Sequence, residues 1–387
     1  MKPSQYKLII KSPEGVKRVT VIDPLWLRCQ KRVNQPGELI FTLKGNHAAI
    51  SYLENRCIIE LWRRNTDAKL SWYCEGRFIY LCQEKYYYPG KMANEEARSV
   101  EEARERVNAR FTARCLGALW LLSTRVVAYP KNWSNLSIFE AVSGKYIAEK
   151  VVDTNCGPNA TYAINRRLRE GTISGLTVGV LYQTGDYYLE CSGQNVLELL
   201  QFIADLEEAD FNLVYADAGG WQFRFYDETA GMGTDRRGTV RFSLSFDNIG
   251  MPRYVNDCRR EKTVGIVAGT ETAAGIPYAI VYSANYSPTH DQEVFIDEND
   301  IEVLDLLRFA GESELNLYQR IEKIDFDILQ TPGLFYGRDY FLGDLVTGRW
   351  EDIDLEMKII GIDIELENNG SDRIKVRTKR ISANANA

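Results

Sequence analysis

Residues 6–62 form a series of short runs rich in branched and aromatic side chains, and turn residues separate these runs. The turns are Pro-Glu-Gly at 13–15 and Gln-Pro-Gly at 35–37. The run at 56–64 continues the alternation of side chains between two faces. A period of two residues is typical of β-strands, so this part of the chain predicts a small β-barrel or β-sandwich.

The pattern changes after this first β region. Residues 71–88 predict another pair of strands. The charged, alanine-rich segment near 90–110 has only a thin apolar stripe, so we expect an exposed helix or an insertion loop there. Residues 111–130 return to the composition of buried strands, and Pro130 indicates a junction between domains.

Two segments in the middle of the chain show helical spacing. Apolar positions after Ser143 fall on one face, so we expect Ser143 to cap a helix that Gly157-Pro158 ends. The second helix is expected within 192–209, with Ser192 as its cap. Strands separated by glycine-rich turns follow it at once, which predicts a helix laid on an antiparallel sheet.

The last third of the chain begins near Arg253 with alternating runs typical of strands. Residues 300–323 predict one or two helices, interrupted at Gly311, and further strands then close a β domain. The fold class is therefore α+β and rich in β structure. The predicted domains are a β domain at 1–130, a central α+β region at 131–252 and a second β domain at 253–387.

Composition and charge narrow the possible functions. Hydrophobic residues make up 45% of the 387 residues and charged residues 26%, which is typical of a folded globular protein. The net charge of -7 argues against a protein that grips phosphate backbones. The N-terminus lacks the apolar run of a signal peptide, and the eight cysteines form no CxxC pair. We expect a cytosol-like compartment and reduced, mostly buried thiols.

Few residues offer catalytic chemistry. Asp339 and Asp344 are a conceivable acid and base pair, but an acidic chain contains many such pairs by chance. Cys156 is a conceivable nucleophile with His47 or His290 as its base, yet Gly157-Pro158 directly after it favours a helix terminus. Neither histidine has a second histidine at metal-ligand spacing, and the glycine-rich segments lack phosphate-binding motifs. We expect no catalytic residue, no metal site and no cofactor.

The order of these parts, together with five segments, resembles the tail hub of bacteriophages, most closely the hub proteins of long-tailed siphophages. The segments cover most of the chain: "CQKRVNQPGELIFTL" at 29–43, "RCIIELWRR" at 56–64, "SGKYIAEKVVDTNCG" at 143–157, the helix 192–207 and "YGRDYFLGDLVTG" at 336–348. The resemblance implies two tube-type β-barrel domains near the two ends of the chain, with α/β domains between or inserted. Three copies would then place six related barrels around the axis of a sixfold tail tube.

On this resemblance, the stretch around "DYFLGDLV" is a structural turn in a barrel hairpin rather than a catalytic loop. Tyr340 and Phe341 precede the turn, Gly343 permits it, and Asp344 hydrogen-bonds it before the strand begins at Leu345. The chain ends in "SANANA" soon after the last expected strand, which implies a hub without a cell-wall-digesting or receptor-binding extension.

The resemblance also implies partners and a location. A homotrimeric ring would join tail-tube ring proteins on one side and spike or fibre proteins on the other, with a tape-measure protein as a further candidate partner. DNA would pass through the lumen without specific binding, because the chain is acidic. The protein would reside in the virion, at the tail tip or baseplate, without membrane insertion. Two alternatives stay open: a cell-wall hydrolase or esterase with an unrecognised site, and a carbohydrate- or receptor-binding module that uses surface aromatic residues.

Overall fold

The chain forms two compact units, which are described separately below. The first comprises Met1–Pro252 and Asp325–Ala387, and the second Arg253–Ile324. The computed structural model describes residues 4–22, 24–88, 108–128, 137–161, 170–216, 219–228, 230–273, 275–299, 301, 303–329, 331, 333–351, 353–366 and 372–381. The charged segment expected near 90–110 lies, as far as residue 107, outside these described residues.

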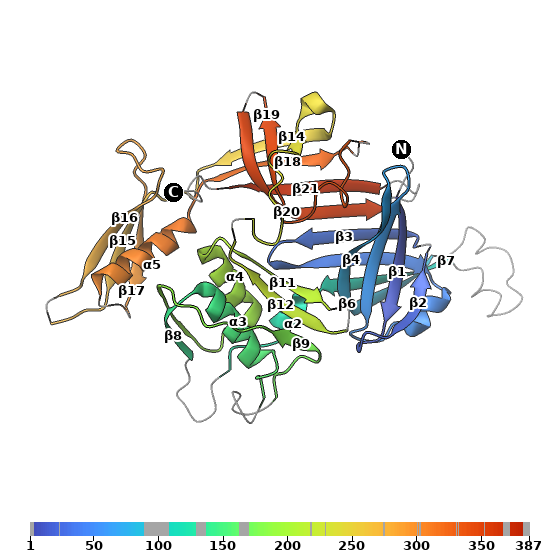
Figure 1. Ribbon diagram of the computed structural model, residues 1–387, viewed down its shortest axis with the longest axis horizontal. Helices are drawn as coiled ribbons and strands as arrows, with labels where there is room; N and C mark the ends of the chain where they lie inside the picture. The colour runs from blue at the N-terminus through green and yellow to red at the C-terminus, as the bar shows by residue number, and fades with distance from the viewer. Residues whose placement is uncertain are drawn as a thin grey trace, which may run out of the picture. The chain divides into compact units, whose positions relative to one another are not determined.

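One sheet of thirteen strands dominates the first unit (Figure 1). Its order is β14-β18-β21-β20-β3-β4-β7-β6-β5-β1-β2, with β19 attached to β20 and β13 attached to β19. The N-terminal part of the chain contributes β1 (Gln5–Lys11), β2 (Lys17–Val21), β3 (Trp26–Arg32), β4 (Gln35–Lys44), β5 (Ile58–Asn65), β6 (Leu70–Tyr88) and β7 (Asn108–Gly117). The C-terminal part contributes β13 (Arg241–Phe242), β14 (Ile249–Asp257), β18 (Ile321–Ile328), β19 (Leu345–Trp350), β20 (Ile353–Leu366) and β21 (Asp372–Arg380).

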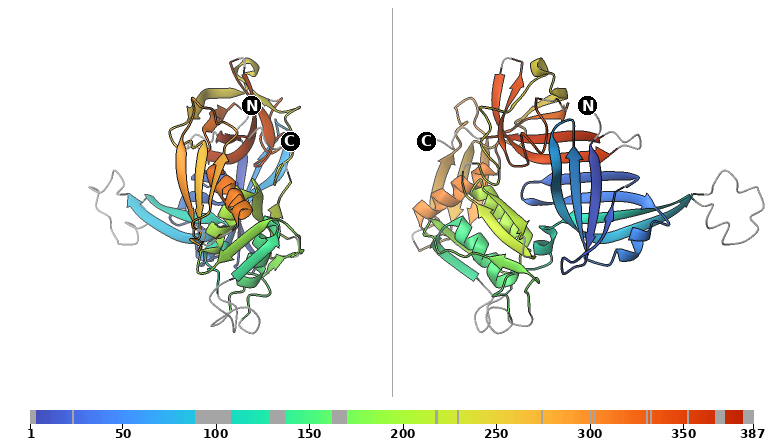
Figure 2. Two further views of the ribbon diagram at one scale, coloured as in Figure 1. Left: turned by 90° about the vertical axis from the view of Figure 1, so that its left-hand side faces the viewer. Right: turned by 45° about the vertical axis from the view of Figure 1, so that its right-hand side comes forward.

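The first and last parts of the chain meet in this sheet. Strand β20 pairs antiparallel with β3, from Leu366 opposite Leu27 to Gly361 opposite Arg32. Figures 1 and 2 show the N-terminal strands in blue beside the C-terminal strands in red. The predicted boundaries at 130 and 253 stay a prediction, and the structure adds a pairing that the sequence did not indicate. Closure of each strand group into a separate barrel also stays a prediction.

The middle of the chain folds as helices with small sheets, one of which contains a parallel strand pair beside the predicted antiparallel one. Strands β11 (Asp210–Tyr215), β12 (Trp221–Tyr226) and β9 (Leu176–Val178) form one sheet, and β8 (Ser137–Val142) pairs with β10 (Tyr187–Cys191). The helices here are α2 (Trp120–Ser123), α3 (Gly144–Asn155) and α4 (Val196–Leu206). Buried side chains from α3, α4, β11 and β12 form one continuous apolar core.

The helix caps show where local sequence was sufficient and where it was not. Ser143 caps α3 by accepting from the Tyr146 backbone N–H at 3.2 Å, so this prediction is confirmed. The expected cap at Ser192 is wrong, because Asn195 caps α4 and accepts from the Leu197 N–H at 3.0 Å. The amide of Asn195 also donates to the Ser123 carbonyl at 2.8 Å, a tertiary contact that fixes the start of the helix.

The second unit is a helix on a three-stranded sheet. The strand order is β16-β15-β17, with β15 at Val264–Gly269, β16 at Tyr278–Tyr282, β17 at Glu293–Glu298 and α5 at Leu304–Asn316. The expected interruption at Gly311 is wrong, because α5 runs through it. A Cβ atom at Gly311 would lie 2.3 Å from Cγ2 of Val267, so this glycine permits close packing of α5 on the sheet.

Two short 3-10 helices, Ala48–Tyr52 and Leu244–Phe246, complete the secondary structure of the described residues. Five of the eight cysteine side chains are buried: Cys29, Cys57, Cys115, Cys156 and Cys191. Within the described part of the chain, the structure contains no helix with both the length and the apolar composition that a membrane crossing requires.

Candidate functional site

The turn before β19 is built from Gly343 and Asp344. Gly343 has φ +92°, in the left-handed region that favours glycine. Its surroundings are also tight, since a Cβ atom there would lie 2.7 Å from Cγ of Met232 and 3.0 Å from the Gly233 nitrogen. Strand β19 begins two residues later, at Leu345. Backbone conformation and close approach therefore both require glycine at this position.

The Asp344 carboxylate holds the turn to the segment that precedes β13. It is 1% exposed and accepts from the backbone N–H groups of Phe341 and Thr234, both at 2.8 Å. It also accepts from Nε of Arg236 at 2.7 Å. Three donors from two distant parts of the chain therefore converge on one carboxylate, which acts here as a structural acceptor.

Asp339 has a separate structural contact. Its carboxylate accepts from the Phe335 N–H at 2.7 Å and from Nη2 of Arg338 at 2.6 Å. Asp339 and Asp344 thus accept hydrogen bonds from different backbone segments. The geometry supports a structural role for each carboxylate more strongly than an acid and base pair.

Aromatic side chains next to the turn contact two other strands. Tyr340 is fully buried, and its ring lies 5.2 Å from that of Phe242 in β13, edge to face. The Phe341 ring lies 5.7 Å from that of Tyr73 in β6, and the Arg236 guanidinium lies 5.5 Å from its centre. The loop therefore brings β6 and β13 together with β19.

A buried charge cluster lies beside this turn, and sequence reasoning missed it. Arg63 in β5 and Glu75 in β6 have fully buried side chains, with Nε and Oε1 2.6 Å apart. Arg63 also donates to the Tyr336 carbonyl at 2.8 Å, and the Tyr336 hydroxyl donates to Glu75 at 2.8 Å. Nζ of Lys31 in β3 donates to the Tyr336 hydroxyl at 3.0 Å and lies 3.4 Å from Glu75 Oε2.

The electrostatics of this cluster favour the ionised pair. Burial raises the pKa of Glu75, but the charges of Arg63 and Lys31 outweigh burial and leave the pKa below its ordinary value. Burial raises the pKa of Tyr336 well above its ordinary value, so this hydroxyl stays protonated and able to donate. The cluster thus links β3, β5, β6 and the loop before β19 through charge-assisted hydrogen bonds.

The sequence did contain a signal for Arg63. It continues the alternation of Ile59 and Leu61, both of which are buried, so a period of two places Arg63 on the same buried face. A charge on such a face predicts a buried partner. The identity of the partner could not be predicted, because Tyr336 is 273 residues away.

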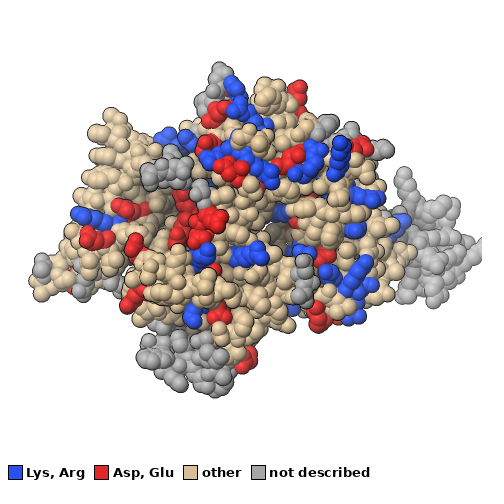
Figure 3. Space-filling view, viewed as in Figure 1, with Lys and Arg blue, Asp and Glu red and all other residues tan. Residues whose placement is uncertain are grey.

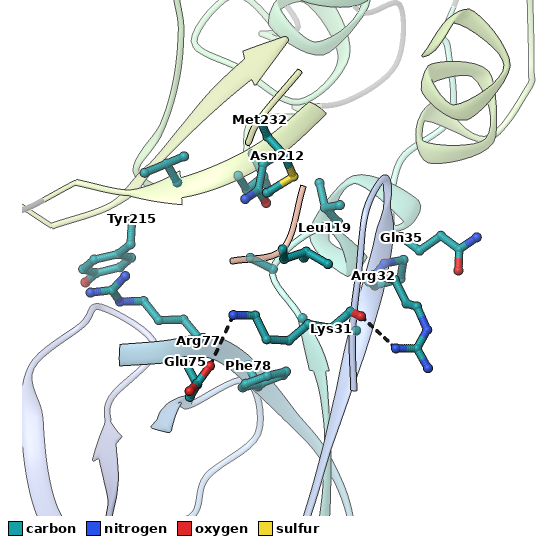
Figure 4. A pocket seen from close by; sticks show the side chains of 18 of the residues that line it. Lys31, Arg32, Gln35, Glu75, Arg77, Phe78, Leu119, Asn212, Tyr215 and Met232 are labelled. Carbon is teal, nitrogen blue, oxygen red and sulfur yellow. Dashed lines mark hydrogen bonds and ion pairs between the residues drawn. The ribbon is translucent and has the colours of Figure 1, made fainter. Parts of the chain in front are cut away.

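A cavity of about 290 Å³ lies next to the cluster, between the large sheet and the sheet of β11 and β12 (Figure 4). Lys31, Glu75 and Arg77 lie on one side of it, and Asn212, Tyr215 and Met232 on the other. Its cations already have partners: Arg77 donates to Glu60 at 2.8 Å, and Lys31 contacts Glu75. The cavity is therefore a junction between parts of the first unit, with its charges mutually neutralised.

The other sequence candidates lie in different places. Cys156 is the buried C-cap residue of α3, as the helix-terminus interpretation predicts. His47 caps the 3-10 helix Ala48–Tyr52 by accepting from the Ala49 N–H. His290 lies in the second unit, with Nε2 3.0 Å from the buried carboxylate of Glu261. Among the described residues, no group of three or more His, Cys, Asp and Glu side chains could hold a metal ion.

Comparisons with solved structures show the same fold in phage tail proteins. The 43 kDa tail protein of prophage MuSo2 from Shewanella oneidensis has a TM-score of 0.56 at 13% identity, covering 97% of this chain and 98% of that chain. The tail protein from Neisseria meningitidis MC58 has a TM-score of 0.56 at 9% identity, covering 97% and 96%. Prophage tail protein gp18 from Listeria monocytogenes EGD-e has a TM-score of 0.51 at 11% identity, covering 98% and 95%.

Sequence comparison assigns the family. No curated protein matches the chain. The model of one protein family matches residues 16–378, which is most of the chain. Together with the shared fold, this match confirms the resemblance to phage tail proteins. The chain belongs to the family described as Siphovirus ReqiPepy6 Gp37-like protein.

Proposed function

We propose that this tail protein is the hub of a phage tail tip or baseplate, where three copies form a ring that continues the tail tube. The ring joins the tube to distal tail and spike or fibre proteins and performs no catalysis. The family match and the shared tail-protein fold support this assignment.

The pairing of β3 with β20 carries the proposal. It places an N-terminal and a C-terminal group of strands side by side in one sheet. Three such chains around an axis supply six strand groups, and a threefold ring can then match a sixfold tube. The described strand order ends in β14 on one side and β2 on the other. Edge strands carry backbone groups that are suited to contacts with a neighbouring copy.

The charges on the large sheet suit a channel wall. At the seam, Nη2 of Arg32 lies 2.6 Å from Asp363, and Nη2 of Arg377 lies 3.2 Å from the same carboxylate. Figure 3 shows basic and acidic side chains interspersed over the visible surface. Cations that neighbouring carboxylates hold are less available to DNA phosphates. In our proposal this face lines the lumen, and DNA passes it without specific binding.

The remaining parts of the proposal concern partners and location. The rims of the ring contact tail-tube ring proteins above and spike or fibre proteins below, and a tape-measure protein is a further candidate. The protein resides in the virion at the tail tip or baseplate after synthesis in the host cytoplasm. The turn at Tyr340, Phe341, Gly343 and Asp344 orients β19 within the C-terminal strand group.

The native mass of the purified chain tests the assembly. We expect a species near three times 44.2 kDa, or rings formed with a tail-tube partner, and no release of fragments from peptidoglycan. A stable monomer that cleaves peptidoglycan would instead support a tail-associated hydrolase. Strong binding to duplex DNA that weakens with salt would contradict the proposed channel wall.

A further inference from the structure

The sheet of the second unit has one covered face. Side chains of Val267, Val281 and Ile296 pack on this face against Leu307 and Leu315 of α5. Figure 1 shows α5 lying across the three strands. Because successive side chains of a strand point to opposite faces, the residues between these core positions form the other face.

The strand register arranges this other face, here called the open face, in three rows. One row contains Tyr282, Val264 and Glu293, the next Ile280, Ile266 and Phe295, and the third Tyr278, Ala268 and Asp297. In each row the first residue belongs to β16, the second to β15 and the third to β17. The open face therefore has an exposed column of Tyr-Ile-Tyr, a central apolar column in which Val264 and Ala268 are buried, and an exposed column of Glu-Phe-Asp.

Large apolar side chains are unusually accessible here. Ile280 is 56% exposed and Phe295 is 61% exposed, and both belong to the middle row of the open face. Tyr278 and Tyr282 are exposed on either side of Ile280. The ring of Tyr286 lies 4.6 Å from that of Tyr282 and extends the aromatic surface. Contiguous exposure of this kind marks interaction sites, whereas single exposed residues are ordinary.

The open face is complementary to itself. Consider two copies stacked face to face, related by a twofold axis parallel to the strands. The β17 column of each copy then lies over the β16 column of the other. Glu293 faces Tyr282 of the second copy, Asp297 faces Tyr278, and Phe295 faces Ile280. A twofold axis across the strands would instead place Glu293 over Asp297, where like charges repel.

We propose that the open face binds the open face of a second copy of this chain in the arrangement with the twofold axis parallel to the strands. Tyrosine hydroxyls donate to carboxylates at both ends of the contact, and the apolar row is buried in the middle. This contact goes beyond the proposed ring and does not depend on it. It pairs either single chains or whole rings.

The size of the surface sets the expected affinity. Three strands of about five residues cover roughly 14 Å by 17 Å, given the ordinary spacings of a sheet. That area is well below the ~800 Å² per partner of a standard stable interface, so the association is weak and reversible. We expect a dissociation constant on the order of 100 μM.

Sedimentation equilibrium of the full-length chain over a wide concentration range tests the contact. The mass of the wild-type protein should double reversibly as concentration rises, whether the smaller species is a single chain or a ring. Ile280→Lys should weaken the doubling by at least about tenfold, because an unpaired ammonium would be buried. Leu317→Lys is the matched control, since Leu317 is 47% exposed at the C-terminal end of α5 and lies outside the open face.

A charge exchange tests the register. Tyr282→Glu alone should weaken the doubling, because residue 282 would then face Glu293 of the second copy. Adding Glu293→Arg should restore it, because each new pair has opposite charges. Thermal unfolding checks that every variant is folded. Absence of doubling in the wild type, equal doubling in Ile280→Lys, or loss of doubling in Leu317→Lys would overturn the proposal. Failure to form trimers would bear only on the ring.

Discussion

Arg63 and Glu75 carry opposite charges and are both fully buried. This burial determines how a substitution of either residue changes the free energy of unfolding. Removing two charges from water costs several kcal/mol per ion, and their attraction offsets this cost only while both are present. Tyr336 and Lys31 complete the hydrogen bonds of the Glu75 carboxylate. We therefore expect the cluster to specify how β5, β6 and the loop before β19 fit together more than it adds to net stability.

We predict that Glu75→Gln lowers the free energy of unfolding by about 3–5 kcal/mol, because Arg63 keeps a buried charge without its counter-ion. The double variant Arg63→Met with Glu75→Leu should lose much less, since no buried charge remains. Denaturant unfolding measures both. Equal losses in the single and double variants would show that packing, rather than charge, dominates this position.

The same pair predicts a pH dependence. The pKa of Glu75 in the folded protein lies below its ordinary value of 4.5, so ionisation of this carboxylate stabilises the fold above that pH. The contribution declines as pH falls below 4.5 toward the folded-state pKa. The difference in free energy of unfolding between wild type and Glu75→Gln should therefore narrow under acidic conditions. A difference that stays constant from pH 7 into that range would contradict the assigned ionisation.

Asp344 and Asp339 differ in burial, so we expect their substitutions to lower the free energy of unfolding by different amounts. Asp344→Ala should lower the free energy of unfolding by about 2–4 kcal/mol, because it leaves backbone donors of Phe341 and Thr234 unsatisfied near Arg236. Asp339 has a side chain that is 27% exposed, so water can replace its contacts and Asp339→Ala should cost less. Chemical denaturation of the two variants tests this order, and the reverse order would refute it.

At the scale of elements, the turn into β19 depends on glycine for two separable reasons. Gly343 has a positive φ and also has Met232 and Gly233 against its Cα. Gly193 has a positive φ of +76° but open space around it. Gly193→Ala therefore reports backbone strain alone and serves as the matched control.

We predict that Gly193→Ala lowers the free energy of unfolding by about 1–2 kcal/mol. Gly343→Ala should lower it by about 1–3 kcal/mol more, because the added methyl group overpacks the site. Differential scanning calorimetry or denaturant titration measures both. Equal effects of the two substitutions would show that Met232 and Gly233 move aside without cost, and that the close approach is not essential.

Local patterns in the sequence predicted some of the helices and strands. Alternating runs predicted the strands of the first and last β regions, and Ser143 predicted the start of α3, because both signals lie within a few residues. Ser192 was misjudged although the true cap, Asn195, accepts from a backbone N–H only two residues away, whereas Gly311 was misjudged because it acts through a tertiary contact with Val267. The turn at Gly343 has a local signal in the sequence, whereas the link from Asp344 to Arg236 has none, because 108 residues separate the ion pair.

At the scale of the molecule, the antiparallel seam of β3 and β20 determines the architecture. The paired residues Cys29 and Ile364 are 335 positions apart and both are fully buried. No periodicity in the sequence reports a pairing across that separation. The order of parts and the resemblance to tail hubs predicted two related strand groups, which stays a prediction; the structure shows that N-terminal and C-terminal strands share one sheet.

The most direct test of the trimeric hub is cryo-electron microscopy of the tail of the particle that carries this chain. We predict three copies around the tail axis at the tip, with the strand groups on either side of the β3–β20 seam arranged as six positions that continue the tube. Density for a single copy, or for copies placed away from the axis on the tail surface, would contradict the account.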